Sequence, residues 1–171
     1  MPYLASNFAA RVDIGESASD VEEWSRIVEE QHVSTVDLAA RRLVSAISRP
    51  DRSDALIDAI IVWENLLGTK RKVSANVTRA IAQMLEDDPS RQLTLEASLR
   101  NVYDVRSRVV HGNLVEQGTV TAACRDAIDA AVRVLRVCYR KGSEWLKLDS
   151  TQRANAVLRE AVTRPKSRPR A

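Results

Sequence analysis

Apolar positions along the chain recur three and four residues apart, the spacing that places side chains on one face of an α-helix. The clearest example lies between Ser34 and Pro50, where four apolar residues form one stripe, Val36, Ala39, Leu43 and Ile47. No segment shows the strict apolar-polar alternation of a half-buried strand. The spacing predicts seven helices, at about residues 20–32, 35–49, 54–67, 74–85, 94–110, 119–140 and 151–162.

The connections between these helices are also readable. Gly68 follows the third helix and is expected to cap its carboxyl end. Residues 87–90 include Pro89 and are expected to form a turn. The third helix is predicted to bury one face, made by Leu56, Ala59, Ile60, Trp63 and Leu67.

Composition supports a helical fold. Aromatic residues make up 4% of the 171 residues, and Gly and Pro number five each, so turn-forming and sheet-favouring residues are scarce. The length suits one domain with a substantial core. We therefore predict an all-α helical bundle of six to seven helices over residues 19–162, with the third to sixth helices as its core. Residues 1–18 are expected to be irregular, and residues 163–171 to form a disordered basic tail.

The charge distribution narrows the possible partners. The net charge is +3, but the tail alone carries four basic residues and no acid, Arg164, Lys166, Arg168 and Arg170. Removing those four charges from +3 leaves −1 for the rest of the chain, so the folded part is not basic overall. Any contact with a polyanion must come from the tail or from a local patch. A short basic loop is predicted at Lys70, Arg71 and Lys72.

The two cysteines, Cys124 and Cys138, lie fourteen residues apart in one predicted helix. Such a separation is about 20 Å along the axis, too far for a disulfide within the helix. We expect both to be core residues in a reducing compartment. Neither a signal peptide nor a membrane span is predicted, since the most apolar stretch, 55–63, is interrupted by Asp58. A cytoplasmic location follows, and neither a metal site nor a cofactor is expected.

Two charged residues interrupt predicted apolar faces. In the fifth helix the series Leu95, Leu99, Val102 and Val109 has a gap at Arg106. In the third helix the missing member is Glu64. A guanidinium on a buried stripe requires a carboxylate, a hydrated groove or an anionic ligand. Arg106 and Glu64 are possible partners, with Arg79 as a competitor for Glu64, and a purely structural ion pair is the alternative.

The two histidines differ in their predicted surroundings. His32 ends an acidic helix, where it serves as an ordinary C-terminal cap. His111 stands at the end of the fifth helix, directly before Gly112, and could turn towards Arg106. Ser107, four residues earlier, could hold the imidazole ring by a hydrogen bond. Imidazole exchanges protons near neutral pH, so His111 is a candidate acid or base.

The segment from Asn101 to Gly112, NVYDVRSRVVHG, resembles the Arg-x4-6-His signature of HEPN domains, and more specifically the Apea-like HEPN group, in which Gly follows the His. The upstream segment 55–68, ALIDAIIVWENLLG, is similar to the group's helix that ends in an aliphatic residue, Glu and a Leu-Leu pair. Ser107 departs from the Asn, Asp or His that many catalytic members carry after the Arg. Trp63 replaces a smaller aliphatic residue.

The resemblance implies a metal-independent endoribonuclease that acts as a homodimer, with Arg106 and His111 of both subunits lining a shared cleft. His111 would act as general acid or base, and Arg106 would hold the scissile phosphate. The products would be a 2′,3′-cyclic phosphate and a 5′-hydroxyl. Ser107 and Glu64 would support the site, while Arg108 and Tyr103 are weaker candidates for RNA contacts.

The same family contains members that bind RNA or a protein partner without cleaving. A non-catalytic interaction module is therefore the alternative function. A small HEPN chain is also typical of toxin-antitoxin or antiphage defence systems, which implies an antitoxin or sensor protein as a possible partner.

Overall fold

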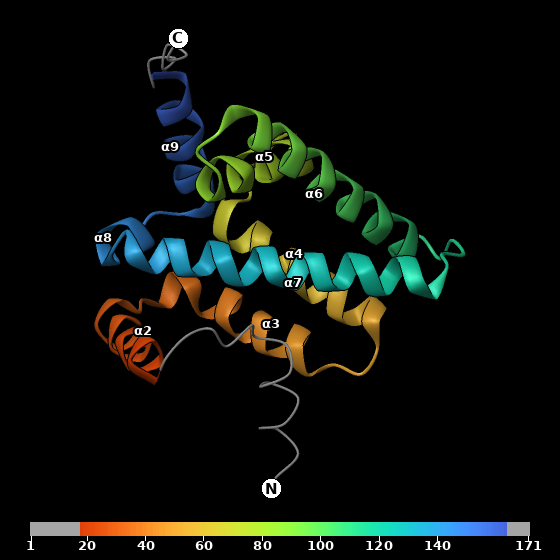
Figure 1. Cartoon of the computed structure of the whole chain (residues 1–171), viewed down its shortest axis with the longest axis horizontal. Helices are drawn as coiled ribbons and strands as arrows, with labels where there is room; N and C mark the ends of the chain where they lie inside the picture. The colour runs from red at the N-terminus through yellow and green to blue at the C-terminus, as the bar shows by residue number, and fades with distance from the viewer. Residues whose placement is uncertain (1–17, 164–171) are drawn as a thin grey trace, which may run out of the picture.

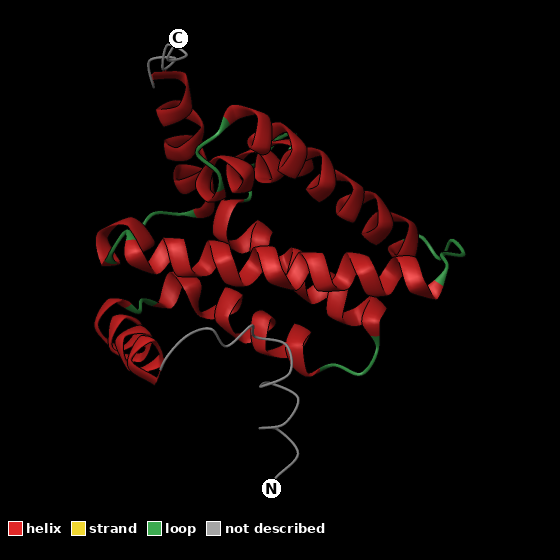
Figure 2. Cartoon of the chain, viewed as in Figure 1, coloured by secondary structure: helices red, strands yellow, loops and turns green. Residues whose placement is uncertain are grey.

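The computed structural model describes the backbone of residues 18–163 and the side chains of residues 21–159. Within this part the chain forms only helices and their connections (Figure 2). Their bounds are α2 (Ala18–Gln31), the 3₁₀ helix η1 (Ser34–Val36), α3 (Asp37–Ser48), α4 (Arg52–Leu67), α5 (Val73–Leu85), α6 (Pro89–Val110), α7 (Gln117–Arg140), α8 (Ser143–Leu146) and α9 (Ser150–Thr163). The predicted all-helical bundle is confirmed. The predicted basic tail and almost all of the predicted irregular N-terminal segment fall outside the described residues.

Helix α4 is the centre of the bundle. It packs against α3 on one side and against α7, which crosses it. Helices α5, α6 and α9 lie towards its carboxyl end (Figure 1). All five residues of its predicted apolar face are fully buried, and so are Ala55, Val62 and Leu66 on its other sides. Trp63 donates from Nε1 to the carbonyl of Ala127 at 3.0 Å, which ties α4 to α7. Burial all round explains why α4 tolerates few polar residues.

The predicted turn at residues 87–90 is wrong in its second half, because α6 begins at Pro89. Asp88 is the N-cap, and its side chain accepts a hydrogen bond from the backbone N–H of Arg91 at 2.9 Å. Proline is well tolerated in the first turn, where its missing N–H has no helical partner. Helix α4 likewise starts earlier than expected, since Asp51 caps it by accepting from Asp54 N at 2.9 Å. The short helix α8 was not predicted.

Gly68 ends α4, as predicted, but not through the left-handed conformation that favours glycine. Its φ and ψ are −67° and 139°, an extended conformation. A β-carbon at this position would lie 2.3 Å from the carbonyl oxygen of Glu64. Glycine is therefore required here for close packing against the last turn of α4.

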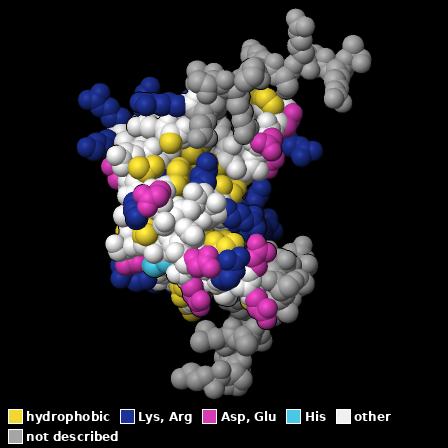
Figure 3. Space-filling model, turned by 90° about the vertical axis from the view of Figure 1, so that its left-hand side faces the viewer, with side chains coloured by type: hydrophobic (Ala, Val, Ile, Leu, Met, Phe, Trp, Pro, Cys, Tyr) yellow, Lys and Arg dark blue, Asp and Glu magenta, His cyan; other side chains and the backbone are white. Residues whose placement is uncertain are grey.

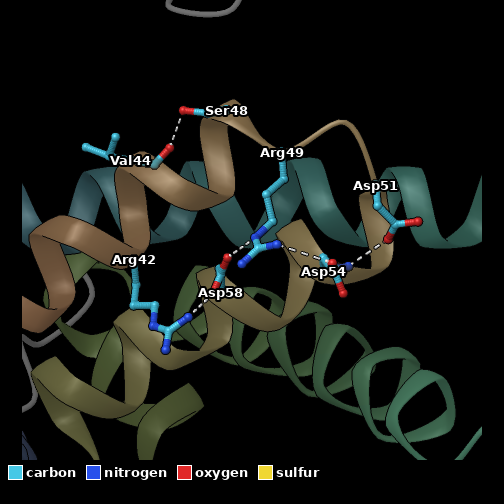
Figure 4. A network of polar contacts seen from close by, with 7 residues as sticks. All are labelled: Arg42, Val44, Ser48, Arg49, Asp51, Asp54 and Asp58. Carbon is cyan, nitrogen blue, oxygen red and sulfur yellow. Dashed lines mark hydrogen bonds and ion pairs between the residues drawn. The ribbon is translucent and has the colours of Figure 1, made fainter.

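The polar interruption at Asp58 is a buried ion-pair cluster between α3 and α4 (Figure 4). The Asp58 side chain is 3% exposed and accepts from Arg42 Nη1 at 2.7 Å and from Arg49 Nε at 2.5 Å. Arg49 also reaches Asp54 at 3.3 Å. Both carboxylate oxygens of Asp58 therefore have a cationic partner, which makes its burial tolerable.

Arg153 of α9 is a second buried charge, which the sequence did not reveal. The residue is 1% exposed. Its guanidinium donates to four backbone carbonyls at 2.8–2.9 Å, those of Asn65, Leu66, Leu146 and Leu148. Two of these carbonyls belong to the last turn of α4, where helical partners are lacking. Burial lowers the pKa of Arg153, yet its hydrogen bonds hold the ends of α4 and α8 to α9.

The cysteines lie in the core, as predicted. Neither Cys124 nor Cys138 forms a disulfide, and both are buried. Burial raises the pKa of the Cys138 thiol to about 12, and the nearby Arg153 opposes this shift only in part. At neutral pH this thiol is protonated and unreactive.

His32 follows the last residue of α2, and its N–H donates to the carbonyl of Val28 at 2.9 Å, as expected of a C-terminal cap. Its ring has a further role that was not predicted. Nδ1 lies 2.6 Å from the hydroxyl of Tyr139, and Nε2 lies 2.7 Å from Asp37 Oδ1. The ring therefore connects α2 to α3 and α7.

Among the described helices, none is long and apolar enough to cross a membrane.

Candidate functional site

A pocket of about 490 Å³ opens between α4, α5 and α6. It brings together four of the six residues predicted for the site, Glu64, Tyr103, Arg106 and Ser107. The remaining lining residues are Val73, Ser74, Ala75, Arg100 and Asp104. Three segments that are far apart in the sequence therefore contribute to one polar pocket.

The periodicity of α6 explains this placement. Leu99, Val102 and Val105 are buried against the core. Around the helix axis Arg106 falls between Leu99 and Val102, on the buried stripe as predicted, and Ser107 lies at the edge of that stripe. Arg106 is half-buried at the pocket wall.

Arg106 is incompletely satisfied. Its Nε atom is buried and has no hydrogen-bond partner. The predicted ion pair with Glu64 is not formed within the described residues. Arg79 does not compete for Glu64 either, because it lies 3.6 Å from Glu96. Of the three predicted solutions for this guanidinium, the pocket leaves a hydrated groove or an anionic ligand.

Glu64 is half-buried rather than buried, and its neighbour is Tyr103. The Tyr103 hydroxyl donates to Glu64 Oε1 at 3.4 Å, a long hydrogen bond. The Tyr103 ring packs edge-on against Trp63 with centroids 5.6 Å apart. Burial raises the pKa of Tyr103 far above its usual value, and the Glu64 carboxylate adds to this effect, while Arg106 opposes it. The hydroxyl is therefore a hydrogen-bond donor at neutral pH and cannot serve as a base.

His111 lies outside this pocket. It is the C-cap of α6, with φ −83° and ψ 8°, and its N–H donates to the Ser107 carbonyl at 3.1 Å. Gly112 then adopts φ 71°, which ends the helix. The His111 residue is exposed, and within the described residues its ring has no hydrogen-bond partner. The predicted hydrogen bond from the Ser107 side chain to the ring is not formed, and one chain does not place His111 beside Arg106 in one cavity.

The Arg108 side chain makes a hydrogen bond within the chain. Its Nη2 donates to the carbonyl of Leu114 at 3.1 Å, which holds the loop after α6. The Leu114 side chain itself is 97% exposed, and Val110 on the other side of His111 is 48% exposed. Two exposed apolar residues thus lie within three positions of His111 in the sequence.

The sequence analysis missed Arg100 and Asp104, although a signal for them exists. Residues 100, 104 and 107 are spaced four and three apart, so they share the polar face of α6 that opens into the pocket. Ser74 and its neighbours in α5 come from a different helix. Only the tertiary arrangement reveals their contribution.

Among the described residues, no three His, Cys, Asp or Glu side chains gather into a group that could hold a metal ion. No family model matches the chain, and neither the curated proteins nor the solved structures give a significant match.

Proposed function

We propose that the chain is a metal-independent endoribonuclease of the HEPN type, which acts as a homodimer and leaves 2′,3′-cyclic phosphate and 5′-hydroxyl ends. The observation that carries the proposal is the buried, unpartnered Nε of Arg106 at the wall of an open polar pocket. Arg106 lines this pocket, and the volume of about 490 Å³ leaves room for a phosphate whose non-bridging oxygens accept from its guanidinium.

The chemistry requires one proton acceptor and one proton donor. The unprotonated imidazole of His111 removes the proton from the ribose 2′-hydroxyl, and O2′ then attacks the phosphorus. The bond from phosphorus to the 5′ oxygen breaks, and a protonated imidazole gives that oxygen its proton. Arg106 stabilises the charge that develops on the phosphate oxygens. The Tyr103 hydroxyl, held protonated by burial, donates to Glu64 at the pocket wall and thereby orients that carboxylate.

A dimer provides both imidazoles and explains why His111 lies outside its own pocket. The exposed apolar residues on either side of His111, Leu114 and Val110, support an interface at this end of α6. In such a dimer each His111 faces the other copy, and two pockets line one cleft. From the resemblance to HEPN domains we propose a toxin or antiphage defence system in the cytoplasm as the setting, with an antitoxin or sensor protein as its control.

The alternative is a non-catalytic module that binds RNA or a protein partner. It is favoured by the one observation that His111 and Arg106 do not meet within a single chain. A module of this kind would need the pocket but would tolerate the loss of His111.

The test is cleavage of a mixed RNA pool in EDTA by the wild-type chain and by His111→Ala and Arg106→Ala. Matched controls are Asn113→Ala, two residues after His111 in the sequence, and Arg125→Ala, whose side chain is 79% exposed. We expect at least a hundredfold loss of rate in the first two variants, cyclic-phosphate ends in the wild-type products, and little change in the controls. Equal activity in His111→Ala, or no cleavage by the wild type, would support the binding module.

The dimer is tested separately by sedimentation of the wild type and of Leu114→Asp at micromolar concentration. We expect a dimer for the wild type and a folded, inactive monomer for the variant. A wild-type monomer that still cleaves would contradict the shared cleft.

A further inference from the structure

Arginines also gather in a second groove, of about 260 Å³, between the carboxyl-terminal halves of α5 and α7. Three arginines and three apolar residues line it, Arg133, Arg136, Arg140, Met84, Leu85 and Val137. None of these residues belongs to the pocket around Arg106. In Figure 3, which views the end of the molecule that carries α8, Lys and Arg side chains gather at mid-height along one edge.

The three arginines share one face of α7. At 100° per residue, positions 133, 136 and 140 fall within about 60° of one another around the helix axis and span about 10 Å along it. Arg133 also lies 3.4 Å from Glu86 and 3.6 Å from Asp129, while Arg136 lies over the Trp24 ring at 5.5 Å. The contacts of Arg133 leave other N–H donors on its guanidinium, because a guanidinium has five.

The lining has two chemical components. Guanidiniums bind phosphate oxygens in a planar, bidentate manner and also stack on bases. The apolar floor of Met84, Leu85 and Val137 can pack against unstacked bases. Together a basic rim and an apolar floor fit a single strand, whose bases are free, better than a duplex, which presents only its backbone and grooves.

We infer that this groove is a binding site for single-stranded RNA, separate from the pocket around Arg106, and that it holds the substrate strand away from the point of cleavage. The choice of RNA over an acidic protein segment rests on the proposed ribonuclease function. The groove lies towards the end of α7 that is remote from the loop of His111 (Figure 1). From the start of α7 to Arg136 the helix rise gives about 28 Å, so a strand that reaches both places must extend well beyond the two nucleotides at the cleaved bond.

The binding test uses a 20-nucleotide single-stranded RNA with 2′-O-methyl groups, which cannot be cleaved by attack of O2′, and follows fluorescence anisotropy over a range of salt concentrations. The groove variant carries Arg133→Gln, Arg136→Gln and Arg140→Gln. The control carries Arg26→Gln, Arg125→Gln and Lys147→Gln, which remove the same charge from side chains that are 58–79% exposed. Circular dichroism checks that both are folded, and the single variant Arg140→Gln serves if the triple variant is not.

We expect the groove variant to raise Kd at least tenfold and to lower the slope of log Kd against log salt by about 2, since each lost phosphate contact on a single strand accounts for about 0.7. Arg140→Gln alone should raise Kd about threefold. The control should change Kd less than threefold. Equal Kd values for the groove variant and the control would overturn the inference. So would tighter binding of poly-glutamate than of RNA, with the same dependence on the three arginines, because it would identify an acidic protein segment as the occupant.

Cleavage measured beside binding separates this inference from the proposed function. A wild type that cleaves, with a groove variant that binds as the control does, retains the ribonuclease and rejects the groove. A wild type that does not cleave, with RNA binding that depends on the groove arginines, rejects the ribonuclease and retains the groove. Where both hold, the groove variant should raise KM for a 20-nucleotide substrate and leave KM for a dinucleotide substrate unchanged.

Discussion

Two acidic residues of α4, Asp58 and Glu64, lie six positions apart and have opposite surroundings. Asp58 is closed off, with an arginine on each carboxylate oxygen at 2.7 and 2.5 Å (Figure 4). Glu64 faces an open pocket and receives one long hydrogen bond from Tyr103. The same contrast holds for two arginines, since Arg153 donates to four carbonyls whereas the Nε of Arg106 has no acceptor. A charged side chain whose hydrogen-bonding partners are all present stabilises the fold, whereas a charged side chain that lacks a partner can bind a ligand.

The sharpest test of this difference is Arg153→Ala. The substitution leaves the carbonyls of Asn65, Leu66 and Leu148 without a donor, while the Leu146 carbonyl still accepts from the Thr35 hydroxyl. It should lower the free energy of unfolding by about 3 kcal/mol, at about 1 kcal/mol for each lost hydrogen bond. Denaturant unfolding followed by circular dichroism measures it. A control is Arg159→Ala, on the same helix and exposed. A cost below 1 kcal/mol would show that the Arg153 cluster does not hold the helix ends together.

Asp58→Asn should have the next largest effect. It removes the charge that two arginines share, and because those arginines are 40% and 42% exposed and can turn to solvent, the expected cost is about 2 to 3 kcal/mol. Glu64→Gln, on the same helix, should cost less than 1 kcal/mol. Equal losses of stability in the two variants would remove the distinction between a closed and an open site.

Alkaline pH provides a third test, through Tyr103. Its pKa is raised in the folded state by burial, so the folded chain keeps the phenolic proton when the unfolded chain loses it above about pH 10. The corresponding stability is therefore present below pH 10 and declines as pH rises further, by about 1.4 kcal/mol per pH unit. Tyr103→Phe should remove this share of the decline between pH 10 and 11.5. If Tyr103→Phe leaves the pH dependence of the free energy of unfolding in urea unchanged, the Tyr103 hydroxyl is exposed to solvent.

Arg106→Met should change stability least. Its buried Nε contributes no hydrogen bond, so the free energy of unfolding should stay within about 1 kcal/mol of the wild type and could rise. The same variant should lose at least a hundredfold in cleavage. A destabilisation as large as that of Arg153→Ala would mean that Arg106 has a structural partner.

Helical periodicity predicted the helices and the buried face of α4, because those depend on apolar spacing alone. Two helices begin earlier than their apolar spacing predicts, because of capping. The Asp51 side chain caps α4, and the Asp88 side chain, followed by Pro89, caps α6. Arg106 was recognised as exceptional from its gap in the apolar series. Its predicted place on the buried stripe is correct, but the pocket beside it is also lined by residues of α4 and α5, whose packing cannot be read from the periodicity of α6.

The partners of charged residues were beyond the sequence. Glu64 was expected to pair with Arg106 or Arg79, yet its contact is with Tyr103, and Arg79 lies beside Glu96. Arg153 gave no signal at all, because its acceptors are backbone carbonyls that every sequence contains. Contacts between distant helices depend on three-dimensional packing, and the arginine groove of α5 and α7 was missed for the same reason.

The two buried thiols have a practical consequence. Cys124 and Cys138 are the only cysteines in the chain, and neither is accessible in the folded state. An alkylating reagent can therefore modify them only after the core around α7 has opened, and mass spectrometry of the unaltered protein would report how often that happens. Comparing the two sites would show whether the half of α7 near His111 opens independently of the half that carries the arginine groove.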